Sequence, residues 1–201
     1  MSAYNKSKSA MRKIIATINL TIDGFCDHTV SLPEEEMHEI HEHYRELLSH
    51  GDAILYGRKT YQLMEFWKTL LEKPSEEKSM NDFAVVIDKI PKIVFSNTLK
   101  TIDWDTARLS DQTLEEEVLQ LKQQSGKAVF VGSRSLILQL MKLNLIDEYQ
   151  LCVYPIVGGG SLPLFENIHD STIFKLIKTK IFRGGAIILY YEPRKEKQPS
   201  S

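Results

Sequence analysis

Two segments of the sequence join an apolar run to a helical pattern through a single glycine. The first, residues 53–64, reads AILYGRKTYQLM, and the second, residues 127–141, reads KAVFVGSRSLILQLM. In open α/β sheets, ligands bind at the carboxyl ends of the strands. The first amides of the helix that follows have no partner within it and lie at its positive dipole end. Both segments are therefore candidate phosphate-binding turns.

The first turn carries side chains that complement a phosphate group. Gly57 lets the backbone come close to a ligand, Arg58 offers a planar fork of donors, and Thr60 offers a hydroxyl group. The plainer interpretation is an ordinary strand-to-helix turn in which Arg58 and Lys59 are exposed to solvent. Both interpretations stay open on spacing alone.

The second turn repeats the same arrangement with different side chains. Gly132 and the amides of Ser133 and Arg134 can surround a diphosphate, or Ser133 can simply cap the helix. Two such turns in one sheet indicate a phosphate-binding site more strongly than either turn alone. A dinucleotide carries a diphosphate and often a third phosphate, which suits a pair of anion-binding helix starts.

A third segment, KIVFSNTLK at residues 92–100, places Ser96 and Asn97 at a strand end, with Lys100 nearby. These side chains can hydrogen-bond a ribose or its phosphate, although a plain turn is the simpler interpretation. The GxGxxG dinucleotide fingerprint is absent from the sequence. A nicotinamide cofactor would therefore be bound without the Rossmann arrangement.

Two further groups are weaker candidates for a catalytic or metal-binding role. Asp23, just before Gly24, can donate or relay a proton or help to hold a substrate, or it can be a turn residue. The stretch HEIHEH at residues 38–43 lacks the histidine pair at positions i and i+4 that a zincin requires. We expect a solvated helix face there and no metal site.

Apolar runs alternate with helical patterns along the chain. We expect a helix at residues 33–49, started by a capping box of Ser31 and Glu34 with Pro33 in its first turn, and a surface loop at residues 72–82. Asp111 is expected to cap a later helix. Strands are expected at residues 12–22, 53–56, 92–95, 104–109, 128–131 and 149–154, and other helices at residues 61–66 and 136–141.

Two segments near the end of the chain, 174–182 and 186–191, are expected to form a hairpin around Arg183-Gly184-Gly185. Strands that alternate with helices and then end in a hairpin predict an α/β fold. Its central sheet should be mostly parallel with an antiparallel C-terminal edge.

The composition bounds the class of protein. With 42% apolar and 26% charged residues in 201, we expect one globular domain at residues 12–192 and flexible tails at 1–11 and 193–201. A net charge of −2 gives no reason to expect a nucleic-acid partner. The sequence has no apolar run of membrane-spanning length, and Cys26 and Cys152 form no metal-binding pair. No membrane partner and a cytoplasmic location are expected.

The order of these segments resembles the dihydrofolate reductase-like superfamily over about residues 12–192. The segments that carry the resemblance are IIATINLTIDG, ILYGRKTY, KIVFSN, VFVGSRSLILQL and YQLCVYPIVGGGSLPLF. TIDG at 21–24 and GGGSLPLF at 158–165 are similar to the riboflavin biosynthesis reductase, the RibD C-terminal domain, in a stand-alone form. A true dihydrofolate reductase would carry a Trp just after the first strand, and residues 12–36 contain none. The resemblance implies a three-layer α/β fold of dihydrofolate reductase-like type.

The resemblance also implies NADPH as cofactor. In the family, an Arg at the position of Asn97 can bring positive charge to the adenosine 2′-phosphate. Because Asn97 is uncharged, a preference for NADPH over NADH would depend on Arg58. Ser133 replaces the second glycine of the family's pair, and its Cβ is expected to crowd the cofactor. The residues that the resemblance and the turns place at the cofactor are Ala16, Ile22, Gly57, Arg58, Lys59, Thr60, Ser96, Asn97, Gly132, Ser133, Arg134, Leu136 and Gln139.

The implied function is an NADPH-dependent oxidoreductase, similar to 5-amino-6-(5-phosphoribosylamino)uracil reductase. It would transfer a hydride to a small pterin- or aminopyrimidine-like heterocycle or to a carbonyl substrate, with Asp23 as the candidate catalytic residue. Two alternatives stay open. One is a non-catalytic dimeric nucleotide-binding module, and the other is a true dihydrofolate reductase. Because members of the superfamily are often dimers, the resemblance also leaves a homodimer open.

Overall fold

A computed structural model describes residues 11–27, 32–166, 168 and 171–194. The expected tails and Ser31 therefore lie almost wholly outside the described residues. Eight strands form one sheet: β1 (Ile14–Thr21), β2 (Gly51–Gly57), β3 (Lys92–Phe95), β4 (Ala107–Leu109), β5 (Ala128–Val131), β6 (Glu148–Tyr154), β7 (Phe174–Ile181) and β8 (Ile187–Pro193). Their order is β4-β3-β2-β5-β1-β6-β8-β7.

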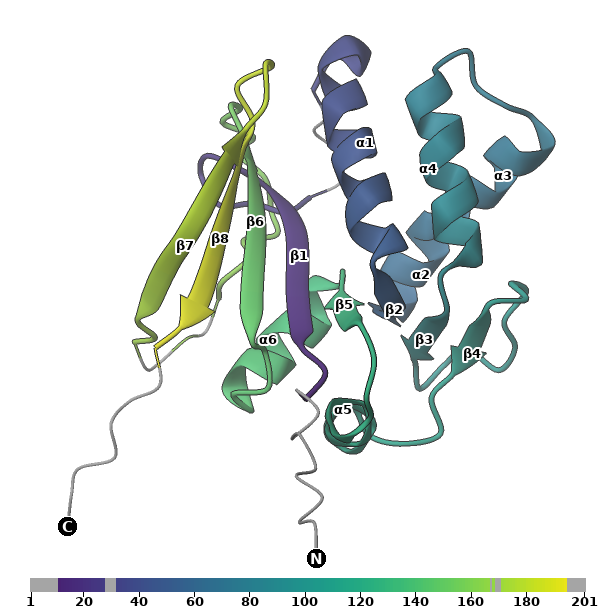
Figure 1. The fold of residues 1–201 in the computed structure, drawn as a ribbon, viewed down its shortest axis with the longest axis vertical. Coiled ribbons are helices and arrows are strands. Elements are labelled where there is room, and N and C mark those ends of the chain that lie inside the picture. The colour runs from purple at the N-terminus through teal and green to yellow at the C-terminus, as the bar shows by residue number, and fades with distance from the viewer. Residues whose placement is uncertain (1–10, 28–31, 167, 169–170, 195–201) are drawn as a thin grey trace, which may run out of the picture.

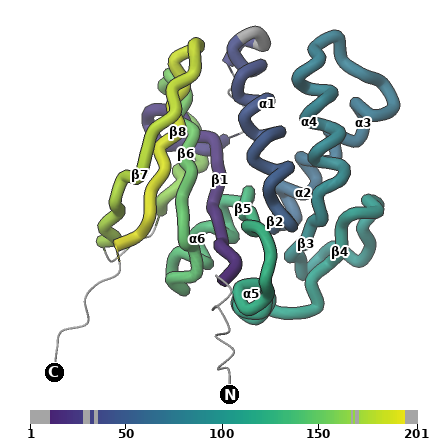
Figure 2. Tube along the Cα trace, viewed as in Figure 1, coloured from purple at the N-terminus to yellow at the C-terminus, as the bar shows by residue number. Residues whose placement is uncertain are grey.

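The pairing of the strands confirms the expected sheet. The strands from β4 to β6 along the sheet pair in parallel, and β8 and β7 add an antiparallel edge. Parallel strands are covered on both faces, which explains why β1 reads as a nearly continuous apolar run. β5 lies between β1 and β2, although more than one hundred residues separate it from β1 in the chain (Figure 2).

Six helices complete the described part: α1 (Glu34–Ser49), α2 (Arg58–Met64), α3 (Phe66–Glu72), α4 (Lys78–Lys89), α5 (Leu114–Gln123) and α6 (Arg134–Lys142). Leucine and valine side chains of α5 and α6 pack with one face of the central strands. Side chains of α1 and α4 pack on the other face, and these two helices stand side by side in Figure 1. The result is the expected three-layer α/β fold.

Several expected boundaries were wrong. Residues 72–82 are not a loop throughout, because α4 begins at Lys78 and buries Phe83 and Ile87 further along. The helix expected after Asp111 is capped instead by Thr113, whose hydroxyl accepts from the Glu116 amide in a capping box. α1 has Pro33 at its N-cap position and no side-chain cap hydrogen bond.

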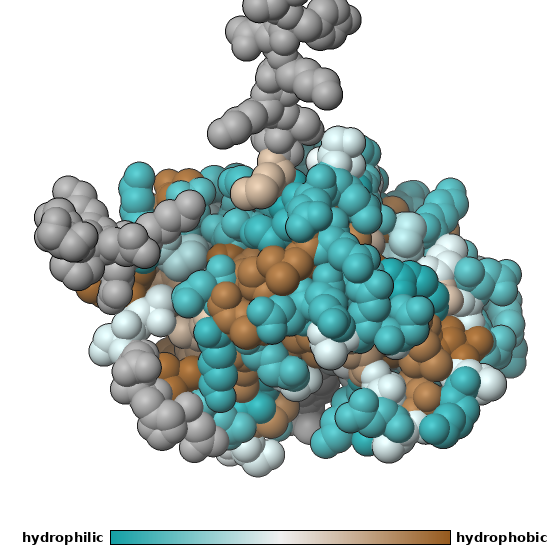
Figure 3. All heavy atoms as spheres, turned by 90° about the horizontal axis from the view of Figure 1, so that it is seen from below, coloured by the Kyte–Doolittle hydropathy of each residue, from teal (hydrophilic) through white to brown (hydrophobic). Residues whose placement is uncertain are grey.

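The C-terminal hairpin forms as expected. The amide of Phe182 donates to the Ala186 carbonyl at 2.9 Å, and Gly185 adopts a φ of 83°, which favours glycine. The opposite end of the molecule, viewed from below in Figure 3, is mainly hydrophilic, with small hydrophobic patches between. Among the described residues, no helix is both long and apolar enough to cross a bilayer.

Candidate functional site

The two glycine turns lie side by side at the carboxyl edge of the sheet. β2 and β5 are parallel neighbours, with Leu55 opposite Val131, so Gly57 and Gly132 leave the sheet together. The Gly57 amide donates a hydrogen bond to Ser133 Oγ at 2.8 Å, which joins one turn directly to the other. The proximity on which a shared ligand site depends is therefore present.

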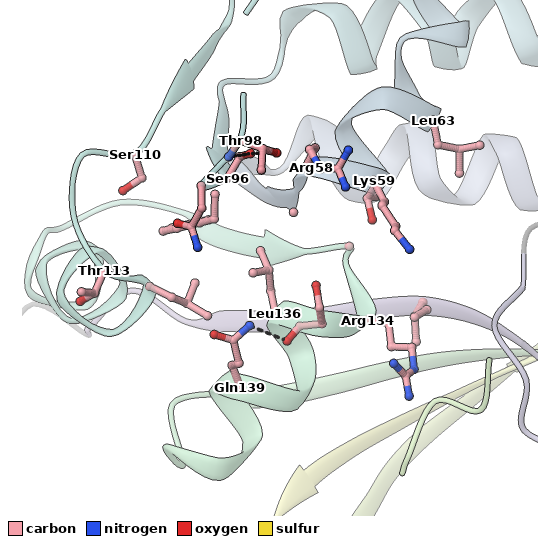
Figure 4. Close-up of a pocket in the computed structure, with 18 of the residues that line it drawn as sticks. Arg58, Lys59, Leu63, Ser96, Thr98, Ser110, Thr113, Arg134, Leu136 and Gln139 are labelled. Atoms are coloured by element: carbon pink, nitrogen blue, oxygen red, sulfur yellow. Dashed lines mark hydrogen bonds between the residues drawn. The ribbon is translucent and has the colours of Figure 1, made fainter. Parts of the chain in front are cut away.

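Both turns open onto a cavity of about 750 Å³, which is within the range of small-molecule sites. In Figure 4, Arg58 and Lys59 lie on one wall, and Leu136, Gln139 and Arg134 lie on the facing wall. The residues from the sequence prediction that line this cavity are Gly57, Arg58, Lys59, Thr60, Ser96, Asn97, Gly132, Arg134, Leu136 and Gln139.

Three predicted residues do not line the cavity. Ala16 is fully buried within β1, and Ile22 lies beyond the strand with 62% of its surface exposed. Ile18, on the same strand face as Ala16, reaches the cavity in their place. The third residue, Ser133, is 1% exposed because its side chain turns inward to the Gly57 amide.

The inward orientation of Ser133 corrects the expectation that its Cβ would crowd the cofactor. The hydroxyl occupies a buried position between the turns, and the residue can meet a ligand only through its backbone. The same contact uses the Gly57 amide, which is then not available to a phosphate. The Gly132 amide is also directed to protein, at 3.4 Å from the Leu55 carbonyl. The amides at the start of α6 remain the donors suited to an anion.

Replacing Ser133 by alanine is expected to destabilise the fold by about 1–3 kcal/mol, because the Gly57 amide then loses its acceptor in a buried site. Urea unfolding measures this change. Ser135→Ala is the matched control, because Ser135 is exposed on the cavity wall and its replacement should alter stability by less than about 0.5 kcal/mol. Equal stabilities for the two variants would show that the Gly57–Ser133 contact contributes little.

The turn after β3 forms another part of the wall. Ser96 Oγ accepts hydrogen bonds from the Thr98 and Leu99 amides at 3.1 and 2.9 Å, so its hydroxyl shapes the turn. Asn97 is exposed on the cavity wall. Sequence reasoning missed Ser110 and Thr113, which line the cavity from the segment after β4. Their signal was the same as for Ser96, polar residues directly after a strand.

The cations of the site differ in their surroundings. Arg134 forms an ion pair with Glu166 at 2.6 Å, which ties its side chain to the segment after the glycine run. Arg58 and Lys59 are exposed on the cavity wall, and neither forms an ion pair within the described part of the chain. These two side chains are therefore the ones best able to meet a phosphate.

Asp23 lies outside both this cavity and the second one described below. Its carboxylate accepts hydrogen bonds from the Gly158 and Gly159 amides at 3.1 and 2.9 Å. Hydrogen bonds, first from Thr21 and then from these amides, lower the pKa of Asp23 to about 2. A carboxyl group that is ionised at neutral pH cannot donate a proton, so the geometry favours a turn role for Asp23 over a catalytic one.

Asp23→Asn is expected to reduce the dependence of the unfolding free energy on pH in the acidic range. In the native chain, the stabilisation from the ionised carboxylate is complete above its unfolded pKa of about 3.9 and is lost as the pH falls through about 2. Urea unfolding between pH 2 and pH 5 should show that slope in the native chain and a smaller one in the variant. Turnover at pH 7 should change by less than about threefold. A large loss of turnover at unchanged stability would instead restore the proton-donor role.

A second cavity, of about 640 Å³, lies between the sheet and helices α1 to α4. It meets the first cavity at the residues that line both, which are Ile18, Thr60, Leu63 and Gly132. Thr17 is 7% exposed, and its Oγ1 has no hydrogen-bond partner among the described residues. Beside it, the Tyr44 hydroxyl donates to Asn19 Oδ1 at 2.6 Å.

Sequence reasoning missed this second cavity. Its signal was the polar alternation of Thr17, Asn19 and Thr21 within an otherwise apolar strand. The expectation of a solvated face at residues 38–43 was also wrong in part, because His41 and His43 are 9% and 8% exposed. His41 lines the cavity. Burial lowers the pKa of its imidazole below the ordinary value, so the ring is neutral at pH 7. No cluster of three potential metal ligands occurs among the residues whose placement is described.

A mostly parallel sheet, paired glycine turns at its carboxyl edge and an antiparallel C-terminal hairpin together define an α/β protein of the dihydrofolate reductase-like class. The sequence matches the RibD C-terminal domain family over residues 12–190. The chain belongs to that family, as the sequence resemblance predicted.

Solved structures share the fold. A putative riboflavin biosynthesis protein from Shewanella sp. PV-4 is similar with a TM-score of 0.66 at 20% identity, covering 92% of this chain and 100% of the other. A pyrimidine reductase-like protein from Corynebacterium diphtheriae NCTC gives a TM-score of 0.62 at 14% identity, covering 92% and 93%.

Two uncharacterised proteins of Bacillus subtilis (strain 168) are similar in sequence. YyaP is 30% identical over 181 residues, which are 90% of this chain and 94% of YyaP. YwjB is 24% identical over 184 residues, or 90% and 97% of the two chains. The similarity to both proteins therefore extends over nearly their whole lengths.

Proposed function

We propose that this chain is an NADPH-dependent reductase that holds its cofactor in the 750 Å³ cavity and its substrate in the adjoining one. The observation that carries this proposal is the hydrogen-bonded pair of glycine turns, which opens on a cavity lined by Arg58 and Lys59. The membership in a reductase-like family supports the same assignment.

The residues present fit a dinucleotide with several phosphates. Arg58 and Lys59 supply charge, and the first amides of α6 supply donors for a diphosphate. The turn at Ser96 and Asn97 adds polar groups suited to a ribose. When bound, a nicotinamide cofactor supplies a hydride, and the protein supplies placement and electrostatics.

The protein's own residues control the junction between the cavities. Gly132 leaves room there because it lacks a side chain, and Ile18 and Leu63 add apolar surface to the same region. None of the described residues that line either cavity is an Asp or a Glu. This argues against a carboxylate proton donor of the dihydrofolate reductase kind, and it favours proton delivery from water or a hydroxyl group.

Fluorescence titration with NADPH tests the binding step, and the loss of NADPH absorbance with a panel of pterins, aminopyrimidines and aromatic carbonyl compounds tests turnover. We expect micromolar binding and consumption with at least one member of the panel. Binding without any consumption would favour the alternative of a nucleotide-binding module. No binding at millimolar NADPH would overturn the proposal.

A further inference from the structure

We infer that the substrate of this chain is an uncharged, unphosphorylated aromatic or heteroaromatic molecule. The inference rests on the proposed function, since it assigns the 640 Å³ cavity to the substrate. It departs from the phosphoribosyl substrate that the family resemblance implies, because the described walls of the cavity carry no Lys or Arg to hold a phosphate.

The described walls of this cavity contain no Lys, Arg, Asp or Glu. Its titratable groups are His41, Tyr44 and Tyr56. Burial lowers the pKa of His41 and raises the pKa of both tyrosines, so all three are neutral at pH 7.

An anion in such a cavity would be poorly stabilised. A phosphate that leaves water needs a cation or several donors, and without them the transfer costs several kcal/mol. Among the described residues that line the two cavities, the Lys and Arg residues are Arg58, Lys59 and Arg134, and all three line the cofactor cavity alone. Charge is therefore segregated, with the cations in one cavity and neutral walls in the other.

The polar groups that are present suit a neutral ligand. Thr17 Oγ1 is buried beside the cavity and has no hydrogen-bond partner in the described part of the chain, so a carbonyl or ring nitrogen of a ligand can complete its hydrogen bonding. The Asn19–Tyr44 pair offers a second polar contact. Trp67 and Phe83 supply aromatic walls, with their ring centroids 4.6 Å apart, against which a flat ring can pack.

Calorimetric titration of the NADPH-loaded protein with matched pairs tests the inference. The first pair is 5-amino-6-(ribosylamino)uracil and its 5′-phosphate, and the second is 1-naphthol and 1-naphthyl phosphate. In at least one pair, the neutral member should bind about 100-fold more tightly than its phosphate. Phosphates that bind as well as their neutral partners, or failure of both neutral compounds to bind, would overturn the inference. Neutral ligands that bind while NADPH does not would overturn the proposed function instead.

Two variants, with a third as their control, test whether the second cavity causes the preference for neutral ligands. Thr17→Val keeps the size of the side chain and removes its unpartnered hydroxyl, so it should weaken the neutral ligand about tenfold without loss of stability. Phe66→Lys places a cation on the half-exposed rim of the cavity and should strengthen phosphate binding at least tenfold. Leu71→Lys, exposed on the same helix but outside the cavity, should leave both affinities unchanged. Identical behaviour of the two lysine variants would count against the inference.

Discussion

Replacing Arg58 and Lys59 together by alanine is expected to raise the dissociation constant for NADPH about 100-fold. Each side chain is exposed on the cofactor cavity and makes no ion pair in the described part of the chain. A charge-assisted contact to phosphate is worth about 1.5 kcal/mol in such a setting, which is roughly tenfold for each residue. Fluorescence titration at low salt measures the change. The affinity of the native protein should also fall as salt is added, because exposed charges are screened.

The matched control removes two positive charges elsewhere. Lys89 and Lys175 are exposed and lie outside both cavities, so Lys89→Ala with Lys175→Ala keeps the change in net charge but not its position. The control should bind NADPH within about threefold of the native protein. If both double variants lose affinity equally, general electrostatic attraction explains the effect, and the assignment of phosphate contacts to Arg58 and Lys59 is wrong.

Gly132→Val is expected to reduce NADPH-dependent turnover at least 100-fold. Gly132 lines both cavities, and a Cβ built on it lies 3.1 Å from the buried ring of Tyr56. The two γ-carbons of valine would therefore narrow the passage through which cofactor and substrate meet. Displacement of reacting atoms by about 1 Å is enough for a 100-fold loss of rate. Steady-state kinetics with the active member of the substrate panel measures it.

A smaller substitution and a stability measurement separate this effect from misfolding. Gly132→Ala adds only the Cβ, so its loss of turnover should be intermediate. Gly132→Val should cost about 1–3 kcal/mol in unfolding free energy through overpacking, which still leaves folded protein to assay. NADPH affinity should fall by less than turnover, because Arg58 and Lys59 line the first cavity alone and their contacts to phosphate do not depend on the junction. Native turnover in the valine variant would show that the junction is not where the reaction occurs.

The strand-to-helix turns were predictable because their signals are local. AILYGRKTY and VFVGSRSL each contain a short apolar run, a glycine and a helix start within about ten residues. Their proximity also followed from the sequence, since parallel strands present their carboxyl ends at one edge. The same reasoning placed Arg58 and Thr60 at the cavity, and the family resemblance placed Gln139 there; all three line it in the structure.

The second cavity was not predictable from such local signals. It forms between the sheet and the helices α1 to α4, and the start of α4 was mistaken for a loop because residues 72–82 are charged and rich in serine. The apolar residues that bury this helix, Phe83 and Ile87, come only after its first turn. Which faces of two helices enclose a space depends on long-range packing, and no single segment encodes it.

The orientation of side chains at the turns also could not be predicted from the sequence. Ser133 fits equally well as a helix cap, a cofactor contact or an obstruction when read in isolation. Its true partner, the amide of Gly57, is 76 residues away in the chain. Asp23 is similar, because its carboxylate accepts hydrogen bonds from the amides of Gly158 and Gly159, which are distant in the chain.

The insertion of β5 between β1 and β2 has a consequence for synthesis on the ribosome. β1 and β2 are made first, yet they are not neighbours, and each lacks its β5 partner until Ala128–Val131 has emerged. Strands with unpaired edges associate readily with other chains. A nascent chain halted before β5 should therefore be aggregation-prone and need chaperone protection. At that stage the wall that α6 contributes to the 750 Å³ cavity has yet to be translated.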